Sequence, residues 1–76
     1  MSSVILPALG EEIEKAVVAF WHYKIGDQVK EGDDLVELVT DKASFNVPAH
    51  TTGVLKEILV QEGQEAKIGQ TLAVIA

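Results

Sequence analysis

The sequence lacks cysteine and arginine, and it has no long hydrophobic run. Without cysteine the chain can form neither a disulfide nor a thiolate metal site. Without arginine it has no bidentate phosphate clamp, and a net charge of −6 repels nucleic acids and anionic lipids. The longest apolar run, Ala16 to Trp21, is far shorter than the ~20 residues that span a bilayer. We therefore expect neither nucleic acid nor membrane as a partner.

The length of 76 residues accommodates one small domain, 1–76. Residues 1–12 lack the basic segment of a secretory signal and the arginines of a transit peptide. The last residues form an apolar, strand-like run. This abrupt end is consistent with a natural terminus or with one domain of a longer protein, and we expect the latter.

An internal repeat organises the chain. Each half reads as strand, turn, short segment, turn and strand. Two copies are too few for a solenoid, so we expect the halves to face each other about a pseudo-twofold axis. The prediction is an all-β flattened barrel, a barrel-sandwich hybrid of two small antiparallel sheets. With a shift of about 37 residues, Val17 falls on Val54, Gly26 on Gly63, Lys30 on Lys67, Gly32 on Gly69 and Leu35 on Leu72.

One segment carries two conflicting patterns. Ile13, Ala16, Val17 and Phe20 have the i, i+3, i+4, i+7 spacing of a helix. We nevertheless expect a strand, because the repeat partner at 53–61 is rich in β-branched residues. The polar pair Lys56 and Glu57 interrupts the alternation there and predicts a bulge. The expected strands cover 4–6, 16–24, 35–40, 44–47, 54–60 and 71–75.

The repeat also predicts the turns and the core. Trp21 and Ile58 are repeat equivalents, as are Leu35 and Leu72, and we expect all four to be buried, with each half supplying one wall of the core. Gly26, Gly32, Gly63 and Gly69 are expected to allow turns with positive φ. A phosphate-binding role for these glycines is excluded because no G-x-G-x-x-G or Walker pattern is present.

The segment Asp41-Lys42-Ala43 lies between two strand-like runs and is expected to form a hairpin turn with Lys42 at its tip. Spacing alone indicates only a solvated lysine, because Asp-Lys lacks the Asn-Gly chemistry of favoured two-residue turns. His22 and His50 are far apart and, without cysteine, make a poor case for a metal site.

Five segments together change this interpretation. In order and spacing they resemble the lipoyl domains of 2-oxo acid dehydrogenase complexes, and the resemblance extends from Val4 to Ile75. One departure is Val39, where the family commonly has glutamate three residues before its modified lysine. The segments are L-P-A-L-G-E-E from Leu6, K-I-G-D-Q-V-K-E-G-D-D-L from Lys24, V-T-D-K-A from Val39, V-P-A from Val47 and G-V-L-K-E-I-L-V-Q-E-G from Gly53.

The resemblance implies a non-catalytic carrier domain with lipoate in amide linkage on Lys42, and Asp41 and Ala43 as flanking recognition residues. Its implied partners are a lipoate ligase or lipoyl transferase, a thiamine-diphosphate decarboxylase, an acyltransferase core and dihydrolipoyl dehydrogenase. The implied parent is a multidomain dihydrolipoamide acyltransferase, with this domain in its N-terminal part. Its implied location is the bacterial cytoplasm, or the mitochondrial matrix for a processed fragment. The implied partner-recognition loop consists of Leu9, Gly10, Glu11, Glu12, Ile13 and Glu14.

Two other functions remain open on the sequence. Biotinyl domains resemble this fold and also use a hairpin lysine, but their acceptor is typically flanked by methionines. Here the flanks are Asp41 and Ala43, and the only methionine is Met1, which favours lipoate. In the other alternative, the chain is an unmodified barrel-sandwich adaptor in which Lys42 has no role.

Overall fold

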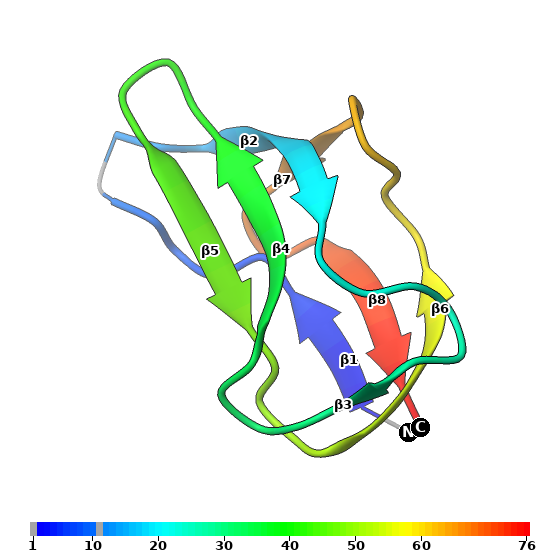
Figure 1. The fold of residues 1–76 in the computed structure, drawn as a ribbon. Coiled ribbons are helices and arrows are strands. Elements are labelled where there is room, and N and C mark those ends of the chain that lie inside the picture. The colour runs from blue at the N-terminus through cyan, green and yellow to red at the C-terminus, as the bar shows by residue number, and fades with distance from the viewer. Residues whose placement is uncertain (1, 11) are drawn as a thin grey trace.

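The computed structural model describes residues 2–10 and 12–76, in which all regular structure is β. The strands form two four-stranded antiparallel sheets, with orders β1-β8-β6-β3 and β5-β4-β2-β7 (Figure 1). The predicted all-β architecture of two small sheets is confirmed. The strands are β1 (Ser2–Ile5), β2 (Lys15–Trp21), β3 (Gln28–Val29), β4 (Asp34–Val39), β5 (Ser44–Pro48), β6 (Gly53–Ile58), β7 (Glu65–Lys67) and β8 (Thr71–Ile75).

Backbone hydrogen bonds occur at equivalent positions of the two sequence repeats. The Gly26 N–H donates to the Leu55 carbonyl at 2.7 Å, and the Gly63 N–H donates to the Val18 carbonyl at the same distance. The repeat shift carries β2, β3 and β4 onto β6, β7 and β8, and β1 and β5 lie at corresponding sheet edges, so the order of one sheet maps onto that of the other. The two sheets are therefore related by a pseudo-twofold axis.

The two halves exchange strands, which the sequence analysis did not anticipate. Strand β3 pairs with β6, and β7 pairs with β2, so each short strand joins the sheet built around the other half. Strands β1 and β5 cross in the same way, pairing with β8 and β4. The prediction that each half supplies one wall is wrong, because each sheet contains strands from both halves. Neither half can complete its hydrogen-bond ladders without the other.

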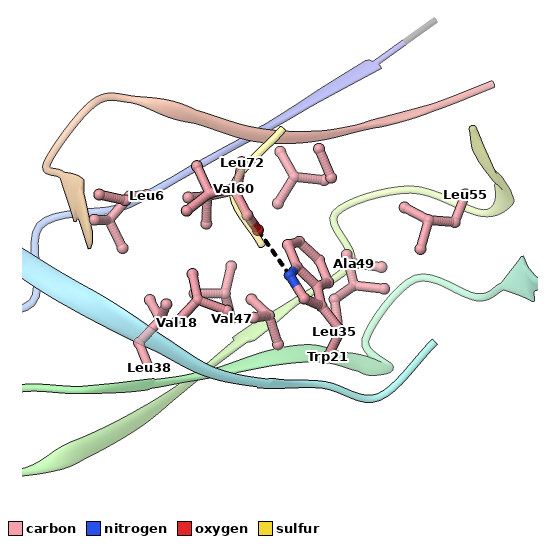
Figure 2. Close-up of a cluster of buried hydrophobic side chains, with 14 of the residues drawn as sticks. Leu6, Val18, Trp21, Leu35, Leu38, Val47, Ala49, Leu55, Val60 and Leu72 are labelled. Atoms are coloured by element: carbon pink, nitrogen blue, oxygen red, sulfur yellow. Dashed lines mark hydrogen bonds between the residues drawn. The ribbon is translucent and has the colours of Figure 1, made fainter. Parts of the chain in front are cut away.

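The core lies between the sheets (Figure 2). Leu35 and Leu72 are fully buried, and Trp21 is only 8% exposed. The indole Nε1–H of Trp21 donates to the Val60 carbonyl at 2.9 Å, so the ring fills the interior without an unsatisfied donor. Ile58 is only partly buried and packs at the edge of the cluster, which corrects the prediction for this residue. The pseudo-twofold axis equates the backbone positions of Trp21 and Ile58, but the indole occupies the interior.

Turns set the strand ends. The strand predicted to reach residue 24 ends at Trp21, because the Lys24 N–H donates to the Asp27 carboxylate at 2.9 Å and closes a turn. Within that turn Gly26 has φ 97°, and its equivalent Gly63 has φ 86°, a conformation that L side chains rarely adopt. Gly32 and Gly69 also have positive φ, so the predicted role of all four glycines is confirmed. The predicted bulge is confirmed by a register shift between Leu55 and Glu57.

Candidate functional site at the β4–β5 turn

The β4–β5 hairpin carries Lys42 at its tip. The last cross-strand pair is Val39 with Ser44, and residues 40–43 form the turn that joins them. This turn and the chain ends lie at opposite ends of the molecule (Figure 1). The Lys42 side chain is 55% exposed. The structure thus places Lys42 on an exposed turn, as the sequence predicts, with Asp41 and Ala43 exposed on either side.

Thr40 organises the turn, a role that the sequence analysis missed. Its hydroxyl oxygen accepts from the backbone N–H groups of Lys42 and Ala43 at 3.2 and 3.1 Å, and it lies 3.1 Å from the Ala43 carbonyl, to which it can donate. The Thr40 N–H also donates to that carbonyl at 2.8 Å. No non-glycine residue within 2–10 and 12–76 has positive φ, so the turn is not of type I′. The threonine hydroxyl supplies the turn chemistry that Asp-Lys lacks.

The β1–β2 loop lies beside the hairpin. Lys42 Nζ forms an ion pair with the carboxylate of Glu12. Glu12 and Ile13 line the surface next to Lys42, and the Ile13 N–H donates to the Gly10 carbonyl at 3.2 Å. The structure therefore brings the predicted partner loop and the predicted acceptor together, although they are 30 residues apart in sequence.

The ends of this loop are tied to the fold. Leu9 packs against the core, and the Glu14 carbonyl accepts from the Ile68 N–H at 3.0 Å. Glu11, the remaining residue of the predicted loop, lies outside the described residues. Between the anchored ends, Glu12 forms the ion pair with Lys42, and Ile13 lies at the same surface.

The ion pair leaves the lysine accessible. The side chains of Lys42 and Glu12 are 55% and 78% exposed. An ion pair this exposed contributes about 0–1 kcal/mol, because water screens the charges and two long side chains must be ordered. The ammonium can therefore leave Glu12 at little cost when another molecule approaches.

An open apolar groove borders the same turn. Val17 and Val39 lie directly opposite each other on β2 and β4, and with Ala19 they line the groove, whose rim includes Thr40 and Asp41. This groove was not predicted from the sequence. The sequence feature that could have indicated the groove is the presence of valine at outward-facing positions of β2 and β4, which alternate with buried residues.

The other candidate residues lie apart from this site. Gly26, Gly32, Gly63 and Gly69 form turns between strands of the two sheets. His22 Nε2 lies 3.4 Å from the side-chain oxygen of Asn46. Within the described part of the chain, no three His, Asp or Glu side chains are grouped to hold a metal ion. That part also contains no helix long and apolar enough to cross a membrane.

Comparisons with known proteins give a consistent result. Residues 2–75 match the biotin/lipoyl family model, described as "Biotin-requiring enzyme". The chain also resembles the solved lipoyl domain of the 2-oxoglutarate dehydrogenase complex from Azotobacter vinelandii. The TM-score is 0.79 and the identity 33%, with 100% of this chain and 96% of that one covered.

Curated relatives are acyltransferase components. The succinyltransferase component of the 2-oxoglutarate dehydrogenase complex of Staphylococcus saprophyticus is 40% identical over 75 residues, 99% of this chain and 18% of that protein. The mitochondrial acetyltransferase component of the pyruvate dehydrogenase complex of Caenorhabditis elegans is 44% identical over 73 residues, 95% of this chain and 14% of that protein. The chain thus spans less than a fifth of the length of these relatives.

Proposed function

Because the chain belongs to the biotin/lipoyl attachment family, as a lipoyl domain of the 2-oxo acid dehydrogenase type, we propose that Lys42 carries lipoate as a swinging arm. The observation that carries this proposal is the position of Lys42, exposed at the tip of a hairpin held by Thr40. The arm would move acyl groups and electrons between the decarboxylase, acyltransferase and dihydrolipoyl dehydrogenase components of one complex. The domain itself is a substrate of these enzymes rather than a catalyst.

The geometry around Lys42 fits attachment. In the loading step the neutral Nζ attacks the carbonyl carbon of ATP-activated lipoate, an amide bond forms, and AMP leaves while Nζ loses a proton. An amine can react this way only if it leaves its ion pair and reaches into a ligase, and the exposure of Lys42 supports both. When bound, lipoate supplies redox and acyl-carrying chemistry, and the domain supplies its placement.

The fixed hairpin supports the carrier role. The scaffold holds one end of the arm and leaves the other end mobile, which raises the effective concentration of the carried group at successive active sites. Asp41 and Ala43 flank the acceptor and would contact the enzyme that attaches the lipoate, while the loop from Leu9 to Glu14 would help partner enzymes recognise the domain. The lengths of the relatives support a parent acyltransferase in which this domain is one part.

The test is enzymatic loading followed by intact-mass measurement. Incubation with lipoate, ATP and a lipoate ligase should add one lipoyl group to nearly all molecules. Parallel incubation with biotin, ATP and a biotin ligase should add biotin at least ten times more slowly. Efficient biotin addition without lipoate addition would reassign the domain to the biotin carriers, and no addition of either group would favour the unmodified adaptor.

The flanks of Lys42 give a further prediction about cofactor choice. Asp41→Met together with Ala43→Met should increase the initial rate of biotin addition at least several-fold, because the flanks then match the biotinyl pattern. The side chains of both residues are exposed, so the double variant should keep the fold. Circular dichroism controls for folding. An unchanged rate in a folded variant would show that the flanking residues do not select the cofactor.

A further inference from the structure

We propose that the apolar groove beside Lys42 holds the hydrocarbon part of the arm in a resting position against the outer face of β2 and β4. This inference rests on the proposed function, because it takes the arm on Lys42 as the occupant of the groove. The apolar lining of the site is formed by Val17, Ala19 and Val39, and the ion pair of Lys15 and Glu65 also borders it. Its ligand is an alkyl chain attached to the neighbouring turn.

The lining of the groove suits an alkyl chain. Val17 and Val39 face each other across the strand pair and remain 39% and 38% exposed. Side chains directly opposite on antiparallel strands have Cβ atoms about 5 Å apart, so the two valines form one continuous apolar surface. An alkyl chain laid on this surface would remove apolar area of both partners from water.

The groove and the acceptor are continuous. Thr40 and Asp41 border the groove and immediately precede Lys42. Val39 is three residues from Lys42, so their Cα atoms are at most ~11 Å apart at 3.8 Å per residue. A lysine side chain extended by an eight-carbon acyl chain reaches roughly 15 Å, at about 1.2 Å of advance per bond of ~1.5 Å. The arm can therefore lie along Val39 and Val17 without any movement of the backbone.

Attachment also removes the competing interaction. The free ammonium of Lys42 pairs with Glu12, which holds the unmodified side chain toward the β1–β2 loop. Amide formation converts the ammonium into a neutral group, so the attraction to Glu12 disappears and an alkyl chain is added. Attachment of the arm would thus replace the contact of the Lys42 side chain with Glu12 by a contact with the apolar groove. A tether this short gives an effective concentration in the mM range, so even weak affinity populates the docked position.

The absence of cysteine allows a test that needs no ligase. In a Lys42→Cys variant the single thiolate attacks octyl methanethiosulfonate, a disulfide forms, and methanesulfinate leaves. The attached octyl chain has a length similar to that of the proposed arm. Valine- and alanine-methyl NMR of this adduct should show nuclear Overhauser contacts from octyl protons to Val17 and Val39, with their shifts displaced relative to a methyl-disulfide adduct.

The repeat supplies a matched control. Val54 is the repeat equivalent of Val17 and is 43% exposed on β6, in the other sheet. Val17→Glu should weaken the octyl contacts to Val39 at least five-fold, whereas Val54→Glu should leave them unchanged. Octyl contacts confined to residues 40–44 would contradict the proposed docking position. An equal loss of octyl contacts to Val39 in the Val17→Glu and Val54→Glu variants would also contradict it. The lipoate ligase assay tests the proposed function independently of this experiment, because the octyl adduct forms whether or not a ligase accepts Lys42.

Discussion

Replacing Lys42 by alanine should abolish lipoate loading completely while changing the free energy of unfolding by less than about 0.5 kcal/mol. The loss is expected because no other lysine occupies the β4–β5 turn. The small stability change is expected because the side chain is mostly exposed and its one ion pair is screened. Intact mass after ligase treatment measures the extent of lipoate loading, and a urea titration measures the change in the free energy of unfolding.

Lys24 provides the control for this substitution. It is also an exposed turn lysine, and its hydrogen bonds to Asp27 use the backbone N–H and carbonyl, which alanine keeps. Lys24→Ala should therefore load as the wild type does. Loading that persists in Lys42→Ala would assign the acceptor to another lysine. Unfolding caused by Lys42→Ala would show that the turn depends on this side chain, contrary to the exposed tip described above.

The second large effect concerns the shared core. Leu35→Ala and Leu72→Ala should each lower the free energy of unfolding by about 2–5 kcal/mol, because both side chains are fully buried and would leave cavities. At ~0.05–0.15 kcal/mol per residue, the whole domain has about 4–11 kcal/mol. Either substitution should therefore remove a large share of the stability, and the two effects should be similar because the positions are related by the pseudo-twofold axis.

Leu59→Ala is the matched control, since Leu59 is 47% exposed and the substitution removes the same atoms. Its effect should be below about 1 kcal/mol. Denaturant titrations of the three variants measure all of these values. A neutral Leu35→Ala or Leu72→Ala would show that the two leucines do not belong to one tightly packed core. A large difference between the two free-energy changes would show that the two related positions are not energetically equivalent.

The repeat decided most of what the sequence could predict about the fold. The segment containing Ile13, Ala16, Val17 and Phe20 has helical spacing, yet Lys15–Trp21 is a strand. Its repeat partner favoured the strand, whereas local periodicity did not. The exchange of β3 and β7 between sheets was not predictable, because two or three residues carry too little periodicity to identify their partners.

Only part of the candidate site could be predicted from the sequence. The place of Lys42 followed from its motif and from the strand-like runs on either side. The contribution of the Thr40 hydroxyl depends on backbone geometry in the turn, and the groove depends on the register that sets Val17 against Val39. Neither register nor turn geometry is encoded by residue type alone, so these features required the structure.

The pseudo-twofold axis also explains why the acceptor hairpin has no twin in the described residues. The axis relates the β4–β5 pair to the β8–β1 pair, and Figure 1 shows the N- and C-terminal ends of the chain meeting at that second pair. At the place that corresponds to the acceptor turn, Ser2 pairs with Ile75, and the described residues of this sequence form no hairpin turn there. Within residues 2–10 and 12–76, the two related halves thus differ at this position, and only the β4–β5 side carries a hairpin turn with a lysine at its tip.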